Sequence, residues 1–256
     1  MTESQTTQPQ KQYKILLVGD TCVDIYHYGT VDRISPEAPV PIFNFHHVVQ
    51  KNGMAANVKE NLENLGCIVD TMYGLKSSVK TRLIDMKSNQ HLMRIDQDAI
   101  SKPLKSYNVG DTYDAVVISD YNKGAVTYEL IQDIRNQFSG PIFVDTKKND
   151  LAKLEGCIVK INHKEYNDAV SYCTDMVVTL GAEGVTYGCD MFRVPEVDVF
   201  DVCGAGDTFL AALTVGYLET GNMSDAIRFA IRASTVTVQK NGVYAPTWDE
   251  INAIDW

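Results

Sequence analysis

The sequence predicts an α/β fold class, with a doubly wound, mostly parallel sheet flanked by helices and a small β-strand lid. Short apolar runs recur along the 256 residues, and most lack the polar alternation of a half-exposed strand, which suits strands covered on both faces. Helical patterns lie between or after many of these runs. Two further segments fit exposed antiparallel strands and predict the lid.

Five apolar runs are the expected strands of the main sheet: KILLVGD at 14–20, DAVVISD at 114–120, PIFVDTK at 141–147, CIVKIN at 157–162 and DMVVTLG at 175–181. Polar residues stand at their carboxyl ends: Asp20, Asp120, Asp145, Asn162 and Thr179. Ligands of open α/β sheets bind beyond these ends, so the five residues predict a site. Helix N-capping is the alternative explanation for some of them.

Helical segments are expected at 55–66 and at 127–140, the second with Thr127 as its N-cap. Near the C-terminus, one helix follows the stretch DVCGAGDTF, and another begins at Ser224 as N-cap and stops at Gly242.

The lid is expected from residues 38–50 and 80–98. Pro39 and Pro41 suit an edge strand, because proline cannot donate to a neighbouring strand. The second segment reads as a hairpin that turns near Ser88–Asn89.

The overall composition argues against a nucleic-acid-binding protein and against a membrane-spanning protein. The net charge of -10 argues against a nucleic-acid-binding surface, and no apolar stretch is long enough to span a membrane. Residues 1–12 read as a short disordered polar tail before a single domain at 13–256. The six scattered cysteines fit buried residues in a reducing compartment, so we expect a soluble cytoplasmic protein.

Nucleotide-binding motifs are informative mainly by their absence. The chain contains no GxxxxGK[ST], and its first strand runs into GDTCVD instead of GxGxxG. What stands out is GAGD at 204–207, small residues at the start of a predicted helix, where unpaired N–H groups bind anions. Asp207 there could accept a proton from a substrate hydroxyl. Alternatively, Asp207 only favours the helix start, by about 0.3–1 kcal/mol.

The stretch DVCGAGDTF resembles the C-terminal signature of the ribokinase-like, or PfkB, carbohydrate kinases. Four further segments resemble the kinase domain for D-glycero-D-manno-heptose 7-phosphate: VGDTCVDIYHYGTVDRISPEAPVPIF, NGMAANVKENLENLG, VVISDYNKGAV and INHKE. The resemblance covers Tyr13 to Trp256 and implies an ATP- and Mg²⁺-dependent sugar or sugar-phosphate kinase. The acceptor it favours is the anomeric hydroxyl of a heptose 7-phosphate. A kinase for another sugar, such as fructose, and a trimmed non-catalytic sugar- or nucleotide-binding homologue are the alternatives.

The resemblance assigns roles to individual residues. It makes Asp207 the general base, and Gly204, Ala205 and Gly206 the anion hole for the transferred phosphoryl group. Sugar contacts are implied for three residues: Asp24, Gly53 and Asn57. Our own candidates for a substrate phosphate are Lys123 and Arg94. Their alternatives are a solvated loop lysine and a surface pair of Arg94 with Asp96 or Asp98.

The same resemblance implies which residues bind ATP and Mg²⁺. Asn162 and Glu165 form an N-x-x-E pair that is associated with Mg²⁺, through water. The full set of expected nucleotide-binding residues is Asn162, His163, Lys164, Glu165, Thr179, Gly181, Gly184, Lys240 and Gly242. The lid of the family also implies a homodimer contact.

Three departures from the family pattern bear on substrate and activity. Met54 stands where the family usually has a second glycine after Gly53. The chain passes from Gly74 directly into the lid, so a helix and a strand are missing there. Lys160 in IVKIN stands where the heptose-kinase subgroup tends to be uncharged.

Overall fold

An eight-stranded sheet forms the centre of the computed structural model, which describes residues 11–105 and 109–255. Its order is β12-β11-β10-β9-β8-β7-β1-β4. The parallel strands are β1 (Lys14–Gly19), β4 (Ile68–Tyr73), β7 (Ala115–Asp120), β8 (Ile142–Thr146), β9 (Ile158–Asn162) and β10 (Met176–Thr179). β11 (Val185–Tyr187) and β12 (Asp190–Phe192) add antiparallel. The predicted mostly parallel sheet is confirmed.

Helices cover both faces of this sheet, because alternate side chains of its buried strands enter two separate cores. One core packs against α1 (Ala55–Asn64), α4 (Ala205–Thr220), α5 (Met223–Val238) and α6 (Trp248–Asn252). The other core packs against α2 (Tyr128–Gln137). The short α3 (His163–Asp168) follows β9, and 3₁₀ turns form at Gly110–Thr112, Leu151–Leu154 and Gly181–Glu183.

The predicted ends of the last long helix were wrong. Asn222, not Ser224, caps α5, because its side chain accepts a hydrogen bond from the backbone N–H of Asp225. The helix ends at Val238, and Gly242 lies in the following turn with a φ of 67°. Thr127 caps α2 as expected, by accepting from the N–H of Leu130.

A second, four-stranded sheet forms the lid, in the order β3-β2-β5-β6. Its strands are β2 (Thr21–Ile34), β3 (Pro41–Met54), β5 (Ser78–Asp85) and β6 (Gln90–Gln97). β3 is an edge strand, as predicted from Pro39 and Pro41, although Pro39 lies just before the strand, and the β5–β6 hairpin turns at 86–89. Sequence reasoning missed β2, and it wrongly expected an all-antiparallel lid, since β2 and β5 pair in parallel.

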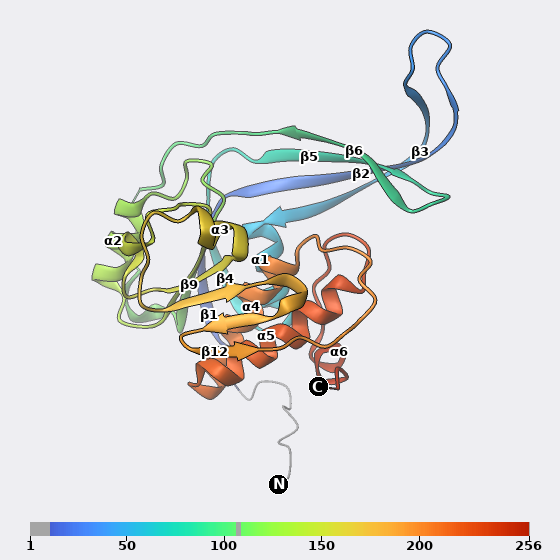
Figure 1. Cartoon of the computed structure of the whole chain (residues 1–256). Coiled ribbons are helices and arrows are strands. Elements are labelled where there is room, and N and C mark those ends of the chain that lie inside the picture. Colours follow the sequence, from blue (N-terminus) through green and yellow to red (C-terminus); the bar gives the residue numbers. More distant parts are fainter. Residues whose placement is uncertain (1–10, 106–108, 256) are drawn as a thin grey trace.

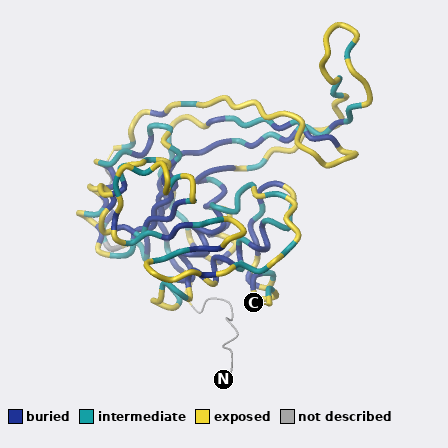
Figure 2. The backbone as a smooth tube through the Cα atoms, in the orientation of Figure 1, coloured by how far each residue is buried: buried dark blue, intermediate teal, exposed yellow. Residues whose placement is uncertain are grey.

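The lid arches over the carboxyl ends of the parallel strands (Figure 1). The reason is connectivity: β1 runs through Asp20 into β2, and β4 runs through residues 74–77 into β5. The far part of the β2–β3 hairpin projects beyond the body and is largely exposed (Figure 2).

Two remaining expectations concern membrane-spanning segments and the N-terminal tail. None of the helices in the described ranges is long and apolar enough to cross a membrane. Residues 1–10 of the predicted tail lie outside the described residues, while Lys11 forms an ion pair with Asp114 over 2.6 Å.

Candidate active site

The carboxylate of Asp207 lies in the first turn of α4, with the whole residue only 5% exposed. Both of its oxygens accept hydrogen bonds from side chains far away in sequence. Asn57 Nδ2, from α1, donates to one oxygen over 2.9 Å, and the Tyr121 hydroxyl, from the loop after β7, donates to the other over 3.0 Å. The fold therefore holds this carboxylate from two sides.

Burial raises the pKa of Asp207 to about 6, because water no longer stabilises its charge. The hydrogen bond from Asn57 opposes this effect, the nearby Asp145 carboxylate adds to it, and Tyr121 and Lys160 lower the pKa. A carboxylate of this basicity is ionised at neutral pH and is well suited to accept a proton. The predicted role as a base stays a prediction, and this environment favours it over a simple helix-start residue.

The loop before Asp207 forms a cradle of backbone N–H groups. Gly204 is the N-cap of α4, with φ 80°, a left-handed conformation that favours glycine. A Cβ on Gly204 would also lie 2.8 Å from Asn57 Nδ2. Ala205 donates to Val202, and the next amides belong to the first turn, whose N–H groups have no partner within a helix. The start of a helix can bind an anion, and the anion hole expected at residues 204–206 stays a prediction.

On the lid side, the Asp24 carboxylate forms a buried ion pair with Arg82. The Arg82 guanidinium also lies 5.1 Å from the centre of the Tyr26 ring. Gly53, on the neighbouring strand β3, packs directly on this group, and a Cβ there would collide with Asp24 and Cys22. Glycine at this position therefore has a packing reason, independent of any sugar.

Met54 adopts a backbone conformation that is normally reserved for glycine. Its φ of 57° and ψ of -134° lie outside the regions open to residues with a side chain, yet its side chain is buried. Met54 precedes the first residue of α1. The backbone at Met54 thus has a conformation typical of glycine, the residue that the resemblance leads us to expect there.

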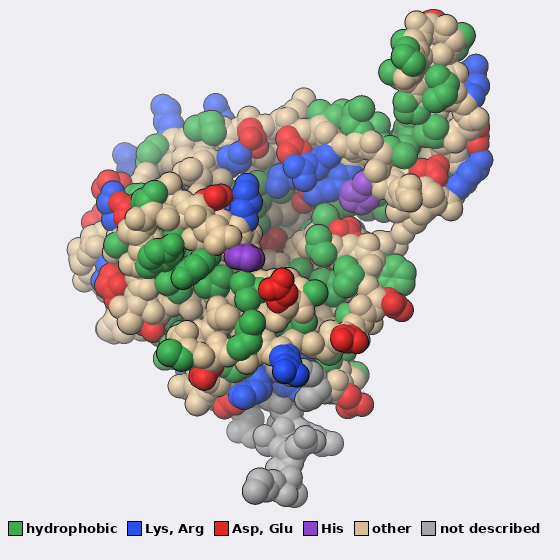
Figure 3. Space-filling view, in the orientation of Figure 1, with side chains coloured by type: hydrophobic (Ala, Val, Ile, Leu, Met, Phe, Trp, Pro, Cys, Tyr) green, Lys and Arg blue, Asp and Glu red, His purple; other side chains and the backbone are tan. Residues whose placement is uncertain are grey.

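One face of the lid carries several cations, and Lys51 of β3, the register partner of Asp24, is one of them. Lys80 and Arg82 of β5 are register partners of Asp24 and Tyr26 of β2, and Arg94 of β6 is the partner of Arg82. Register partners point to the same face of a sheet, so all these side chains share the face of Asp24. Basic side chains accordingly gather beneath the lid, at the rim of the hollow between lid and body (Figure 3).

The two candidate phosphate contacts are both in ion pairs. Arg94 Nε lies 2.8 Å from Asp96, and its side chain is 57% exposed, which is the surface pair weighed from the sequence. Lys123 Nζ lies 2.6 Å from Asp98, at the end of the lid. The backbone N–H of Lys123 also donates to Asp20. Lys80, in contrast, lies 5.5 Å from the centre of the Tyr121 ring and forms no ion pair within the described residues.

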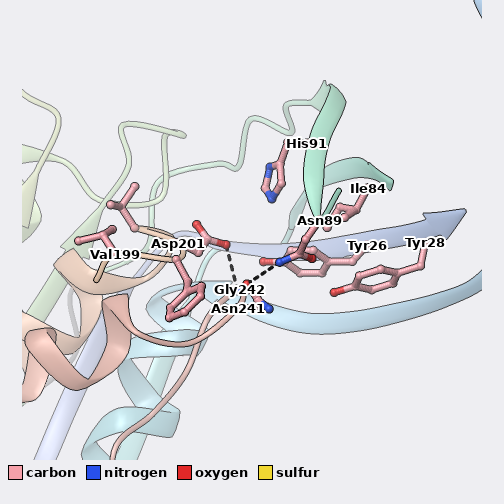
Figure 4. A pocket seen from close by; sticks show the side chains of 11 residues that line it. Tyr26, Tyr28, Ile84, Asn89, His91, Val199, Asp201, Asn241 and Gly242 are labelled. Atoms are coloured by element: carbon pink, nitrogen blue, oxygen red, sulfur yellow. Dashed lines mark hydrogen bonds between the residues drawn. The ribbon is translucent and has the colours of Figure 1, made fainter. Parts of the chain in front are cut away.

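A cavity of about 350 Å³ separates the lid from the loop before α4 (Figure 4). Tyr26, Tyr28 and His91 line it from the lid, and Asp201 and Gly242 from the body. The Tyr26 hydroxyl is buried and has no hydrogen-bond partner in the part of the chain that the structure describes. Asp201 accepts from the N–H of Gly242 over 2.9 Å, which joins the loop before α4 to the turn after α5. The cavity thus offers a free hydroxyl beside the Asp24 and Arg82 pair.

Lid and body are joined at two points next to this cavity. Asn89 Nδ2, in the β5–β6 turn, donates to Asn241 Oδ1 over 3.2 Å. Lys51 Nζ, on β3, donates to the carbonyl of Val243 over 2.8 Å. The structure therefore shows the lid in contact with the turn that follows α5.

The N-x-x-E pair forms a capping box at the start of α3. The Asn162 side chain accepts from the N–H of Glu165, and the Glu165 carboxylate accepts from the N–H of Asn162. Glu165 also pairs with Lys147. Within the described residues, no group of three potential acidic, histidine or cysteine ligands surrounds a metal position. Asn162 and Glu165 fit Mg²⁺ that is bound through water molecules and substrate phosphates. They do not fit a site in which protein side chains supply all the ligands of the metal.

The other predicted nucleotide residues lie along the carboxyl ends of β9 and β10 and in the turn after α5. His163 and Lys164 are exposed at the start of α3, and Thr179 donates to the carbonyl of Ile161 over 3.3 Å. Gly181 and Gly184 bound the 3₁₀ turn after β10, both with positive φ. Lys240 Nζ lies 3.4 Å from Glu250 and 5.0 Å from the centre of the Tyr244 ring. Their ATP contacts stay predictions.

Sequence reasoning missed several side chains that the fold brings to Asp207. Tyr121 is hydrogen-bonded to the carboxylate, and Lys147 and Lys80 lie over its ring at 5.1 and 5.5 Å. Asp145, one of the strand-end residues expected at the site, pairs with Lys160 next to the GAGD loop, and it is this role of Lys160 that was missed. The available signal was charge inside apolar strands, since a buried lysine needs a partner.

Comparison with known proteins places the chain among sugar kinases. Residues 156–250 match the description pfkB family carbohydrate kinase. The bifunctional protein HldE of Nitratiruptor sp. is 33% identical over 299 aligned positions, which cover 93% of this chain and 64% of that protein. HldE of Helicobacter pylori strain J99 is 30% identical, with coverages of 94% and 66%. The chain thus spans about two thirds of the length of these relatives.

The aligned positions outnumber the 256 residues of the chain, so the relatives carry residues that this chain lacks.

Solved structures show the same fold. Phosphofructokinase-2 of Escherichia coli superposes with a TM-score of 0.74 at 16% identity, covering 94% of this chain and 97% of that one. Ribokinase of Arabidopsis thaliana, complexed with ribose and ATP, gives 0.69 at 13% identity, with coverages of 96% and 100%.

Proposed function

The chain belongs to the pfkB family of carbohydrate kinases, and on that premise we propose that it transfers the terminal phosphoryl group of ATP to a sugar phosphate bound beneath the lid. One observation carries this proposal: Asp207, a buried carboxylate with a pKa of about 6, stands at the head of α4 beside a cradle of N–H groups. A base and an anion site on the same helical turn are what phosphoryl transfer to a hydroxyl requires.

The proposed reaction divides the work between these groups. The acceptor hydroxyl gives its proton to Asp207 as its oxygen attacks the γ-phosphorus of ATP. The bond from that phosphorus to the bridging oxygen breaks, and ADP leaves. Amides at 204–206 stabilise the negative charge of the transferred group. Asn57 and Tyr121 keep the carboxylate in place, so less reorganisation is needed during the reaction.

Mg²⁺ would enter with ATP and neutralise charge on its phosphates. Glu165 and Asn162 would hold it through water, since their own hydrogen bonds already engage both side chains. The nucleotide would extend along the ends of β9 and β10, toward the remaining residues predicted to bind it. The ATP-complexed ribokinase with the same fold supports the use of ATP.

A phosphorylated acceptor is favoured by the charges on the lid. Lys80, Arg82 and Arg94 share the face that carries Asp24, and Asp24 is the residue expected to bind the sugar. An acceptor phosphate between these cations would gain charge-assisted hydrogen bonds, and Arg94 could exchange its exposed partner Asp96 for it. The specific acceptor we propose is a heptose 7-phosphate, phosphorylated at its anomeric hydroxyl. Support comes from the motif resemblance and from the HldE relatives.

We also propose that the lid forms a homodimer contact. Its outer face exposes apolar side chains, among them Val48, Met93 and Ile95, which are 45%, 57% and 47% exposed. The projecting hairpin adds Ile34 and Phe45, at 61% and 55%. Exposed apolar patches of this kind are typical of interaction surfaces.

ATP consumption against a panel of sugars and sugar phosphates tests the function, with Asp207→Asn as the matched variant. We expect turnover with a heptose 7-phosphate in the wild type and a loss of at least about 1,000-fold in the variant. Equal rates for the two proteins would refute Asp207 as the base. If no acceptor is phosphorylated but a sugar raises the melting temperature, the chain is a non-catalytic binding protein.

A further inference from the structure

Lys160 occupies a place where charged side chains are rare. It lies inside the apolar run of β9, is 4% exposed, and has Asp145 of β8 as its register partner. Its Nζ is 2.7 Å from Asp145 Oδ2, and Asp145 is also only 4% exposed. Burying an ion pair often adds no stability compared with packed apolar side chains of similar size. Stability alone therefore does not explain the pair.

The ammonium of Lys160 faces the first turn of α4. A Cβ on Gly206 would lie 2.9 Å from Nζ, so the charge is next to the third residue of the GAGD stretch. This end of the helix is already positive, because its N–H groups are unpaired and its dipole points there. A cation added at this end is unfavourable unless negative charge compensates for it.

Asp145 and Asp207 supply part of that compensation, but Asp145 is the only acceptor that Lys160 Nζ has among the described residues. An ammonium carries three donors, so two of them have no acceptor within residues 11–105 and 109–255. Burial without acceptors is costly for a charged group. An anion in the 204–206 cradle would both compensate the charge and accept from the ammonium.

We infer that Lys160 is a further residue of the phosphoryl-transfer site, where its ammonium, held in place by Asp145, stabilises the negative charge of the transferred phosphoryl group beside Gly206. This inference rests on the proposed kinase function. Lys160 stays protonated and forms no covalent bond. The phosphorus–oxygen bond to ADP breaks, the bond to the acceptor oxygen forms, and the acceptor proton passes to Asp207.

The test compares Lys160→Gln with the double variant Asp145→Asn/Lys160→Gln. The single variant leaves Asp145 buried without its cation and can fail to fold, whereas the double variant removes both charges together. Lys153→Gln is the matched control, because it removes a lysine from an exposed pair with Asp150. Each protein is assayed for kcat and for the KM of ATP with a heptose 7-phosphate, and for binding of ADP with and without aluminium fluoride as a mimic of the phosphoryl group.

We expect the double variant to fold, to keep its KM for ATP within about threefold, and to lose about 100-fold in kcat, as when an oxyanion donor is removed. It should bind ADP normally but lose the gain in affinity that aluminium fluoride gives the wild type. Recovery of kcat to within threefold in the double variant would overturn the inference, since the pair would then be structural. An aluminium fluoride effect equal to that of the wild type would overturn it as well.

The two proposals fail in different ways. If the wild type phosphorylates no acceptor and Asp207→Asn changes nothing, the kinase function fails. If Asp207→Asn abolishes turnover while the double variant stays active, only the role of Lys160 fails.

Discussion

The hydroxyl of Tyr121 donates a hydrogen bond to the Asp207 carboxylate over 3.0 Å, across 86 residues of sequence. The two residues come from opposite halves of the chain and meet at the carboxyl ends of the main strands. Together with Asn57, Tyr121 leaves neither carboxylate oxygen without a donor. The basicity and the orientation of the proposed base thus depend on residues that no local motif contains.

Tyr121→Phe should weaken catalysis and move its pH dependence. The hydrogen bond from Tyr121 lowers the pKa of Asp207, so its loss raises that pKa further above 6. The acid limb of the kcat/KM profile should then shift to higher pH. At pH 6 the loss should reach tenfold or more, because a hydrogen bond to a charged group contributes about 1.5–3 kcal/mol. An unchanged acid limb would show that Tyr121 does not act on the base.

Asp207→Asn should stabilise the fold at neutral pH while it abolishes turnover. Burial raises the pKa of Asp207 from the ordinary value of 3.8 for an aspartate to about 6. Between these values the folded state binds more protons than the unfolded state, so this group lowers stability as pH rises from about 4 to 6. A shift of about two units corresponds to roughly 3 kcal/mol at pH 7. Urea unfolding of both proteins at pH 4 and pH 7.5 checks this, and an equal difference at the two pH values would contradict it.

At Met54, a glycine variant should have a higher free energy of unfolding than an alanine variant, the reverse of the usual order. Its φ of 57° and ψ of -134° cost a residue with a Cβ about 1–3 kcal/mol, and glycine avoids this cost. Met54→Gly and Met54→Ala both lose the buried side chain, but only alanine retains the strain. We therefore expect the glycine variant to be the more stable by about 1 kcal/mol in chemical denaturation. A more stable alanine variant would mean that the backbone at residue 54 is not strained.

Removing the lid cations should weaken binding of a phosphorylated acceptor selectively. Lys80→Gln/Arg94→Gln should raise the KM for a sugar phosphate by about tenfold or more, since charge-assisted hydrogen bonds to a phosphate are lost. The KM for ATP should change little. Lys87→Gln is the control, because Lys87 is an exposed lid lysine that pairs with Asp32. If the control and the double variant behave alike, the acceptor phosphate does not bind to this face.

The lid contact predicts an oligomeric state that can be measured directly. Light scattering should give the mass of a dimer for the wild type. Phe45→Asp should give a monomer, because a charge placed in an apolar interface opposes association. Phe45 is 55% exposed in the single chain, so this change should leave the fold intact. A monomeric wild type at micromolar concentration would remove the proposed contact.

Several features of the protein followed from the sequence alone, because they depend on local chemistry. Apolar runs without alternation predicted the buried parallel strands, since both faces of such strands exclude water. Thr127 and the prolines at 39 and 41 predicted a helix start and an edge strand, and both predictions hold. GAGD predicted a helix start, and α4 begins there, while the anion hole at residues 204–206 stays a prediction.

Only the tertiary structure decided which side chains surround that cradle. Lys160 and Asp145 are fifteen residues apart and meet through the parallel pairing of β8 and β9. Asn57 lies 150 residues from Asp207, and the packing of α1 against α4 brings these two together. Strand β2 was missed. It leaves the main sheet to pair with β3 and β5 in the lid, and the sequence does not indicate which strands it pairs with. The pKa of Asp207 likewise reflects burial and neighbouring charges, which are properties of packing and cannot be read from the order of residues.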